Sequence, residues 1–525
     1  MSNFSLESAR QAAAADSGFT LGPVGRSVVI GLMCLLCIPL GFVVDITIVV
    51  MALGLCNVGV VLFLLLRKDI TWGFLFYLVT VIFFQTGFWI RLPGFPDLYP
   101  ARITSMLLFL IFFGQILLGM RRAPKIGTIE KAMIVFIVVM FISIVTAGQQ
   151  PRWLLLMRGY IYPFMFFYFA RAVVNREAQL KIVFWFLALL GLYFAVMGIF
   201  EKMKWYGLVY PQFIVDPNLR DQGLTRLGFR VRGIFLQPAV LGLVMTMGFF
   251  AAWHALSNFR GIVPLLLRLV LAVTTPATIM FTQTRSVLLG FAGALMIGAW
   301  FSRNMRPMAV TMVLGGMLGV FANWDNLSSE DREAGGMGQM NTIHYRVNLA
   351  IEAFEIFLDH PFLGVGFMNL EEVAPDYRRP RDVPILGHID MGVGGESISH
   401  NIFITVMSEQ GSLGLIPYVL IYWLMWKRTI EMWRRAPRKG LISKDFVVCI
   451  WCAYFAYLVN AMSLELRYFE YVNVLFFFLM GSMVGVGERM FQTQDEAAGA
   501  LASAEPEPTP PADWRVLPRT AGSHR

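Results

Sequence analysis

The sequence predicts an all-α, polytopic membrane protein, and three observations support this fold class. Of its 525 residues, 57% are hydrophobic and only 15% are charged, whereas a soluble domain is typically about 45–50% apolar and 25% charged. The mean hydropathy is +0.63. Apolar runs of about 17 residues or more recur along the chain, and as helices they are long enough to cross a hydrocarbon core of about 30 Å. These observations exclude a soluble enzyme and a membrane β-barrel, whose strands need only about 9–11 residues.

The chain divides into three parts. We expect residues 1–27 to be a cytoplasmic N-terminal segment, because they are polar and Ala-rich and lack the features of a signal peptide. Residues 28–488 form a transmembrane catalytic domain of about 12–14 helices. Residues 489–525 are rich in Ala, Pro and Glu, and we expect a disordered cytoplasmic tail. The expected spans lie at about 28–44, 46–66, 72–90, 102–119, 130–147, 153–173, 181–200, 234–257, 263–281, 284–302, 307–322, 401–426, 445–463 and 467–487.

The distribution of Lys and Arg predicts how the chain is oriented. Threading the spans from a cytoplasmic start places most basic connections on one side, including the run from Lys427 to Lys444. The positive-inside rule assigns that side to the cytoplasm. The opposite, outward side then receives two long loops, at about 201–233 and 323–400, and we expect the chemistry there.

The second loop contains a short amphipathic helix. Four apolar residues recur at intervals of 4, 3 and 4, which places them on one helical face: Val347, Ile351, Phe354 and Leu358. We expect this helix to lie against the membrane face and to end at Pro361. Gly364 and Gly366 then mark either tight turns or a flexible lid.

Arginines gather on the outward side, against the positive-inside bias. They are Arg220, Arg226, Arg230, Arg232 and Arg285. Between residues 205 and 426 there are fourteen Arg and no Lys. Because a guanidinium presents a planar fork that suits phosphate oxygens, this pattern favours a phosphate-binding role. Interfacial snorkelling combined with codon bias is the structural alternative.

Histidines are concentrated in the second outward loop. Four of the six lie there: His344, His360, His388 and His400. His360 precedes a proline at a helix end, where capping is expected. His400 and Asn401 stand where the loop re-enters the membrane, so the imidazole of His400 would be held at the water boundary and is the candidate for proton transfer. No carboxylate or histidine set with metal-ligand spacing occurs in these loops, and we predict no metal and no cofactor.

Four segments resemble the O-antigen ligase and Wzy-type polysaccharide polymerase superfamily. HNIFITVMSEQGSLG at 400–414 is similar to its H-N, nine residues, G-x-x-G motif. RVRGIFLQP at 230–238 resembles its R-x-x-G-x-F-x-x-P block, and TQTR at 282–285 resembles its T-x-S-R block with Thr284 in place of Ser. PFLGVG at 361–366 resembles its P-l-l-G-v-G segment.

This resemblance implies a GT-C-like, metal-independent, inverting glycosyltransferase of the bacterial inner membrane. Its donor would be a glycan on undecaprenyl diphosphate at the periplasmic face. The acceptor would be a second lipid-linked repeat unit in a polymerase or the lipid A core in a ligase. Arg230 or Arg232, together with Arg285 and Arg226, would hold the diphosphate, and His400 would activate or orient the acceptor hydroxyl.

Several alternatives remain open at this point. The helix count and loop length favour a Wzy-type polymerase of exopolysaccharide or O-antigen over a ligase. A lipid-linked glycan flippase or transporter is the alternative from another class, and a purely structural membrane scaffold is a further one. Four residues are candidates to line a shared cavity: Arg158, Asn401, Glu465 and Arg467. The expected partners are the lipid bilayer, a flippase and a chain-length regulator. We expect no nucleic-acid partner.

Overall fold

The computed structural model confirms an all-α, polytopic membrane protein. It describes residues 70–84, 99–146, 153–216, 230–322, 324–328, 341–383, 387–389 and 400–503. Within these residues, eight helices are long and apolar enough to cross a membrane, and three shorter apolar helices accompany them. The expected N-terminal segment and the first two expected spans lie outside the described residues.

The helices of the first half follow the predicted spans closely. They are α4 (Thr71–Phe83), α5 (Pro100–Leu117), α6 (Thr128–Thr146), α7 (Trp153–Leu156), α8 (Tyr162–Val173), α9 (Glu177–Lys202), α11 (Pro238–Ser257), α12 (Ile262–Phe281), α13 (Arg285–Phe301) and α14 (Arg306–Ala322). Short turns of other geometry join them: the π-helical turn η1 (Met157–Ile161) and the 3₁₀ turns η2 (Tyr206–Leu208), η3 (Gln212–Val215) and η5 (Gly233–Phe235). The single span expected at 153–173 is therefore interrupted by η1.

The second half adds a cap and three long helices. The cap comprises α15 (Trp324–Ser328), α16 (Asn341–Asp359), α17 (Leu370–Tyr377) and a two-stranded antiparallel hairpin of β1 (Arg381–Val383) and β2 (Gly387–Ile389). The helices are α18 (Ile402–Arg435), α19 (Lys444–Ala461) and α20 (Glu470–Ser503), with the 3₁₀ turn η6 (Leu466–Tyr468) before α20. Helix α20 runs past residue 489, where we expected disorder, because its continuation is rich in the helix formers Ala, Gln and Glu.

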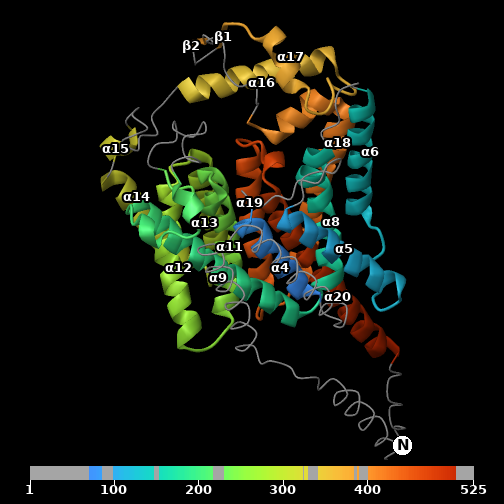
Figure 1. The fold of residues 1–525 in the computed structure, drawn as a ribbon. Coiled ribbons are helices and arrows are strands. Elements are labelled where there is room, and N and C mark those ends of the chain that lie inside the picture. Colours follow the sequence, from blue (N-terminus) through green and yellow to red (C-terminus); the bar gives the residue numbers. More distant parts are fainter. Residues whose placement is uncertain are drawn as a thin grey trace, which may run out of the picture.

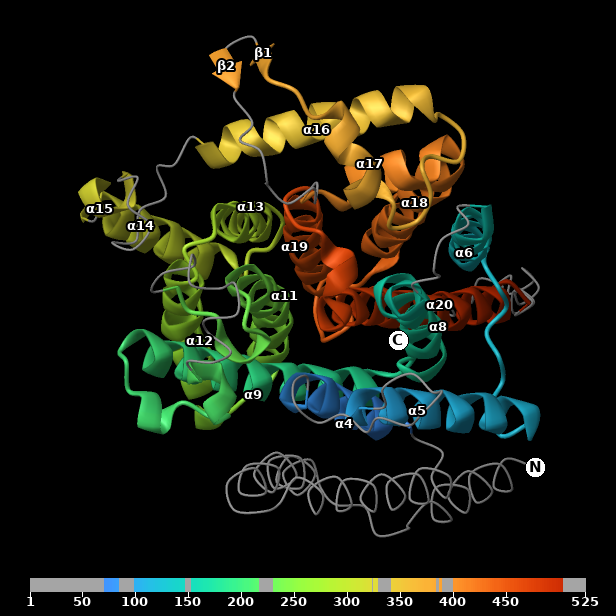
Figure 2. The same ribbon diagram turned by 45° about the horizontal axis from the view of Figure 1, so that its top comes forward.

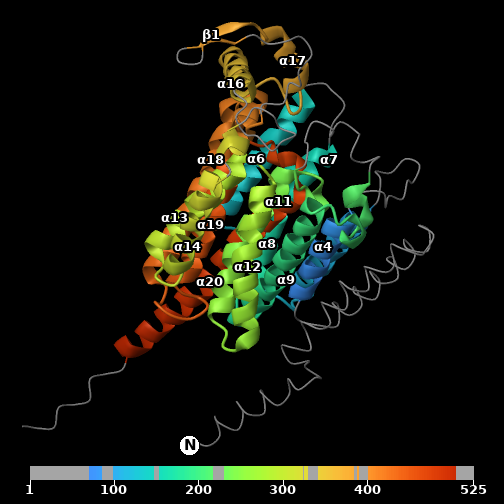
Figure 3. The ribbon, with the colours of Figure 1, turned by 90° about the vertical axis from the view of Figure 1, so that its left-hand side faces the viewer.

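The cap covers one end of the helix bundle. Figures 1 and 2 show α16 and α17 lying across the bundle above the start of α18, with α4, α5 and α9 along the opposite side. The last turns of α20 project from the other end, as Figure 3 shows from the side.

Small residues bring the central helices close together. An added Cβ at Gly481 or Gly485 of α20 would lie 2.2 Å from the carbonyl oxygen of Phe167 or 2.5 Å from that of Arg171, both on α8. Two glycines four residues apart thus form the close contact between α8 and α20 that small residues allow in membranes. At the far end, Arg171 pairs with Glu130 and Glu488, which ties α6, α8 and α20 together.

Helix α16 exposes part of its predicted apolar stripe at the protein surface. Phe354 and Leu358 are 48% and 59% exposed, whereas the buried side is formed by Glu352 and Ile356, and Ile356 packs on Leu370 of α17. Val347 and Ile351 of the stripe are half-buried, so the exposed part of the stripe is formed by Phe354 and Leu358.

Candidate functional site

The two arginine-bearing motifs lie side by side. The backbone N–H of Val231 donates to the carbonyl of Phe281 at 3.1 Å, and the guanidinium of Arg230 donates to the carbonyl of Gln283 at 2.7 Å. Arg285 begins α13 two residues later. The fold therefore brings together segments that are about 50 residues apart in the sequence.

Glu201 organises the turn that carries these arginines. Its carboxylate accepts the backbone N–H of Arg232 at 3.1 Å and that of Gly233 at 2.8 Å. Gly233 has φ of +55°, which a glycine adopts without a steric penalty. Successive N–H groups in such a turn form an anion-binding concavity, and here the last turn of α9 supplies the anion.

Two lysines join the cationic group. A small cavity of about 20 Å³ is lined by Lys202, Lys204, Tyr206, Arg230 and Arg232, among others. The sequence prediction did not include Lys202 or Lys204, although we expect the EKMK segment at 201–204 to lie at an outward edge, where the positive-inside rule disfavours basic residues. Four cations and one carboxylate therefore surround this cavity.

The start of α18 carries His400 and Asn401. Asn401 is the N-cap of the helix, and its side-chain oxygen accepts the backbone N–H of Phe403 at 3.0 Å and of Ile404 at 3.3 Å. An asparagine is among the best residues for this position. His400, immediately before the cap, has φ of +52°, an uncommon conformation for a residue with a side chain. Asn401 thus holds the backbone that positions His400.

The G-x-x-G and P-F-L-G segments interlock through their backbones. Helix α18 is broken at Gly411, where φ is +61° and ψ is −158°. The carbonyls freed by this break accept hydrogen bonds from Val365 at 3.0 Å and Gly366 at 2.9 Å, and the freed N–H groups of Ser412 and Leu413 donate to the loop at 2.8 and 3.1 Å. We predicted one continuous span over this region, and the break is a correction that follows from the interlock.

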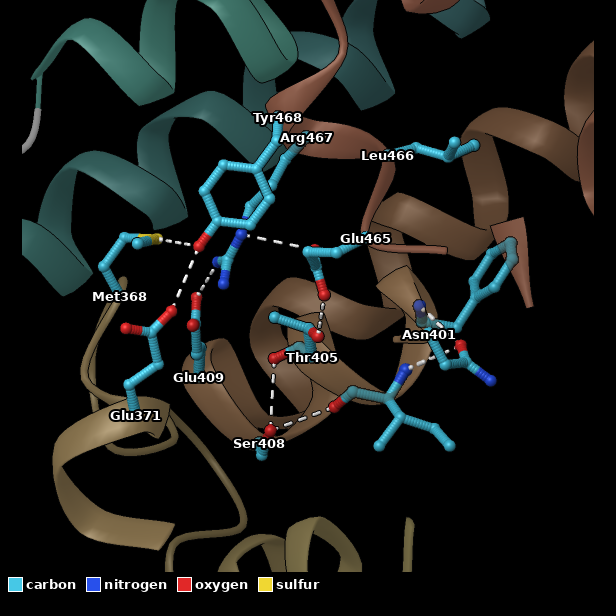
Figure 4. A network of polar contacts seen from close by, with 12 residues as sticks. Met368, Glu371, Asn401, Thr405, Ser408, Glu409, Glu465, Leu466, Arg467 and Tyr468 are labelled. Atoms are coloured by element: carbon cyan, nitrogen blue, oxygen red, sulfur yellow. Dashed lines mark hydrogen bonds and ion pairs between the residues drawn. The ribbon is translucent and has the colours of Figure 1, made fainter. Parts of the chain in front are cut away.

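A buried ionic network holds the first part of α18 against η6 (Figure 4). Arg467 contacts the carboxylate of Glu409 at 2.6 Å and that of Glu465 at 3.2 Å, and Thr405 donates to Glu465. All four residues are at most 4% exposed. Burial raises the pKa of Glu465, and the neighbouring Arg467 opposes this rise. The network joins residues about 60 positions apart in the sequence.

Tyr468 connects this network to the cap. Its hydroxyl donates to Glu371 of α17 at 3.2 Å and contacts the sulfur of Met368, as Figure 4 shows. Burial raises the pKa of Tyr468 to about 12, so its hydroxyl is neutral at physiological pH and acts as a donor. The cap is therefore linked to η6 as well as to the break in α18.

The structure places the predicted residues in distinct groups. Arg230, Arg232 and Arg285 lie in adjoining segments, and Asn401 caps the helix that His400 precedes. The four residues expected to share a cavity separate: Arg158 lines a cavity of its own, Glu465 and Arg467 belong to the ionic network, and Asn401 is a cap. Arg226 lies outside the described residues.

Glu409 is the charged member of the network that we did not predict. It sits inside an apolar span, and an ionisable residue there is a signal of function that the sequence does display. Within the described part of the chain, no three His, Cys, Asp or Glu side chains are placed to hold a metal ion. His254, by contrast, is buried and its ring contacts the carbonyl of Leu441 at 2.7 Å, a structural role.

The comparisons with known proteins agree with the motifs. Residues 267–419 match the family model described as O-antigen ligase. This region contains the TQTR, PFLGVG and HN segments, and the RVRG segment precedes it. No curated protein matches the chain. The match at residues 267–419 supports assigning this multi-pass membrane protein to the O-antigen ligase and Wzy-type superfamily, whose members ligate or polymerise glycans.

Proposed function

We propose that this protein is a metal-independent, inverting glycosyltransferase of the bacterial inner membrane. It transfers a glycan from an undecaprenyl-diphosphate donor at the periplasmic face. The observation that carries the proposal is the pairing of the RVR and TQTR segments, which gathers Arg230, Arg232 and Arg285 at one place. Because these segments adjoin, we expect the three guanidinium groups to bind one diphosphate leaving group.

The chemistry follows from where charge develops. The bond between the anomeric carbon and the diphosphate oxygen breaks as the acceptor hydroxyl attacks from the opposite side, so the configuration inverts. Negative charge grows on the diphosphate, and Arg230, Arg232 and Arg285 stabilise it there. His400 takes the proton of the acceptor hydroxyl, since its backbone is fixed by the cap at Asn401.

The acceptor distinguishes two forms of this activity. We favour a Wzy-type polymerase, in which the acceptor is the end of another lipid-linked repeat unit of exopolysaccharide or O-antigen. An O-antigen ligase, in which the acceptor is the lipid A core, is the second candidate, and the description of the matching family favours it. A polymerase of this kind works with a flippase that delivers the lipid-linked units and with a chain-length regulator.

The test is a reconstituted transfer assay. Purified protein in nanodiscs receives the lipid-linked repeat unit, either alone or with lipid A core. A ladder of lengthened lipid-linked products supports the polymerase, and glycan on lipid A core supports the ligase. Neither product, with protein that is folded and correctly oriented, overturns the proposal.

Arg285→Lys tests the role of the guanidinium fork. We expect it to lose nearly as much activity as Arg285→Ala, because an ammonium cannot make the bidentate contact. Losing one such donor costs about 2.7–4 kcal/mol of transition-state stabilisation, or roughly 10²–10³ in rate. Arg306→Lys is the matched control, since Arg306 is exposed and donates only to backbone carbonyls of α13. Near-wild-type turnover in Arg285→Lys would mean that charge alone is sufficient.

A further inference from the structure

A second, larger cavity lies beside the ionic network. It has a volume of about 150 Å³, and η1, η5, η6 and the start of α20 contribute to it. A charged pair, Arg158 and Glu470, lines it together with six aromatic rings: Phe84, Tyr99, Phe235, Tyr468, Phe469 and Tyr471. Aromatic walls with a few convergent polar groups are typical of small-molecule binding sites.

Two buried polar atoms at this cavity have no hydrogen-bond partner among the described residues. They are the hydroxyl oxygen of Tyr471 and Nε of Arg158, whose nearest carboxylate oxygen, on Glu470, lies 3.6 Å away, beyond hydrogen-bond distance. Tyr471 is only 2% exposed. Because a buried polar group without a partner costs about 1–3 kcal/mol, each such atom in a native protein calls for an explanation. A ligand with hydroxyl groups would supply both partners.

The charged side chains that line the cavity are one arginine and one glutamate. Arg158 lies 3.6 Å from the carboxylate of Glu470, and Tyr77 donates to the same carboxylate at 2.9 Å. The guanidinium of Arg158 also stacks over the ring of Tyr99, 4.5 Å from its centroid. A neutral ligand is therefore favoured over an anionic one, which would compete with Glu470 for Arg158.

Local geometry points to a functional position for Arg158. It belongs to the π-helical turn η1, and such turns inside helices occur frequently at functional sites. The next residue, Gly159, packs so closely on η6 that an added Cβ would lie 3.0 Å from Cβ of Arg467. The π turn therefore presents Arg158 to the cavity while the chain beside it rests on the ionic network.

The cavity is also adjacent to the arginine segment. Phe235 follows Arg232 by three residues, and its ring lies 5.3 Å from that of Tyr471. A substrate with its diphosphate at Arg232 and a sugar in the cavity would extend along η5. Arg232 and the cavity are separated by one 3₁₀ turn. This separation suits two neighbouring parts of a single lipid-linked glycan, or parts of two glycans that meet there.

We propose that this cavity binds one neutral sugar ring of the glycan substrate. The aromatic faces pack on the apolar face of the ring, and Arg158, Tyr471 and Glu470 make hydrogen bonds to its hydroxyls. The volume suits a single ring and not a longer oligosaccharide. This inference rests on the proposed function, and the ring belongs either to the acceptor or to the donor glycan.

The experiment measures binding separately from transfer. The probe is the repeat-unit oligosaccharide released by mild acid from the lipid carrier, titrated into purified protein in nanodiscs and followed by saturation-transfer NMR. Tyr471→Phe removes one oxygen, and we expect it to weaken binding about three- to tenfold. The double variant Arg158→Gln, Glu470→Gln leaves no unpaired buried charge, and we expect a loss of about tenfold or more.

Tyr454→Phe is the matched control, because Tyr454 is a buried tyrosine that donates to the carbonyl of Tyr422 within the bundle. It should bind as the wild type does. Equal affinity in Tyr471→Phe and wild type, or no binding by wild type at millimolar probe, overturns the inference. If the double variant fails to fold, Tyr471→Phe decides alone.

Steady-state kinetics separate the two sources of the sugar and the two proposals. A raised KM of Tyr471→Phe for the acceptor assigns the ring to the acceptor, and a raised KM for the lipid-linked donor assigns it to the donor. Wild-type binding of the probe without any transfer would refute the proposed function alone. Transfer with unchanged KM values in Tyr471→Phe would refute the sugar site alone.

Discussion

Gly364→Ala tests the interlock between the cap loop and the broken helix α18. Gly364 has φ of +65°, and an added Cβ would lie 2.4 Å from both the carbonyl oxygen of Ser408 and the carbonyl carbon of Glu409. These neighbours are backbone atoms, so they cannot rotate away as a side chain can. The loop must move off the helix, and the hydrogen bonds from Val365 and Gly366 are lost with it.

The cost can be worked out from these contacts. The left-handed conformation costs a residue with a Cβ about 1–2 kcal/mol, and two hydrogen bonds contribute about 0.5–1.5 kcal/mol each. We therefore expect Gly364→Ala to lower the free energy of unfolding by roughly 2–5 kcal/mol. Gly119→Ala isolates the first term, because Gly119 has φ of +69° with nothing within 4 Å of an added Cβ.

The assay is SDS-induced unfolding of both variants in mixed micelles. Gly364→Ala should unfold at clearly lower SDS than Gly119→Ala, which should lose only about 1–2 kcal/mol. Gly411→Ala should resemble Gly364→Ala, since its Cβ would lie 2.4 Å from the backbone of Phe362. If Gly364→Ala is no worse than Gly119→Ala, the loop does not pack on α18 as described, and the account of the G-x-x-G motif fails.

Three further predictions concern the site and the cap. A pH-rate profile of the wild type should fall as pH drops through about 6.5, where histidine ordinarily gains a proton, whereas His400→Gln should be about 10²–10⁴-fold slower and flat; wild-type turnover in His400→Gln would exclude a base. Because burial raises the pKa of Glu465, its contribution to stability is fully present at acid pH and is lost as pH rises through the raised pKa. The thermal midpoint of Glu465→Gln minus that of the wild type should therefore increase between pH 4.5 and pH 8. A decrease of this difference would contradict a raised pKa for Glu465. A bimane label at Leu358→Cys should be quenched by spin-labelled lipids and one at Arg379→Cys should not, since both are exposed but only Leu358 lies on the apolar stripe of α16; equal quenching would place α16 away from the bilayer.

The stripe of α16 continues the lipid-facing surface of α18. Phe362, 69% exposed, accepts a hydrogen bond at its carbonyl from the N–H of Leu413, which is 48% exposed. Farther along α18, Ile416 and Trp423 are 64% and 62% exposed. Exposed apolar residues therefore occur on α16, on the loop that follows it and on the apolar helix α18, and such residues are suited to the headgroup region of the bilayer.

Hydropathy predicted the spans well because each buried helix must satisfy its own backbone in lipid, which leaves few choices of structure. The predicted span at 263–281 corresponds to α12, Ile262–Phe281, for this reason. The break at Gly411 and the π turn at Arg158 could not be predicted this way. Both lie within apolar runs, and their causes, the loop at Gly364 and the packing of Gly159 on η6, come from distant parts of the chain.

The candidate site was predictable in kind but not in detail. An excess of outward arginines indicated a phosphate partner, and the structure then set Arg230 beside Gln283. Lys202 was not predicted because it lies just before the segment from 205 to 426, in which Arg occurs without Lys. The pairing of Glu409 with Arg467 depends on the packing of α18 against η6, which no local pattern encodes.

Breaking α18 at Gly411 has a consequence for His400. The segment before the break is short, and an isolated helix of about two turns is not stable by itself. Three separate contacts hold it: the cap of Asn401, the ionic network at Thr405 and Glu409, and the hydrogen bonds to the PFLGVG loop. The proposed base at His400 requires a position fixed to within about 0.5 Å, and we infer that these three contacts fix the segment that follows it. Asn401 and the PFLGVG loop hold this segment through its backbone. We therefore expect their loss to lower turnover without abolishing binding of the donor diphosphate.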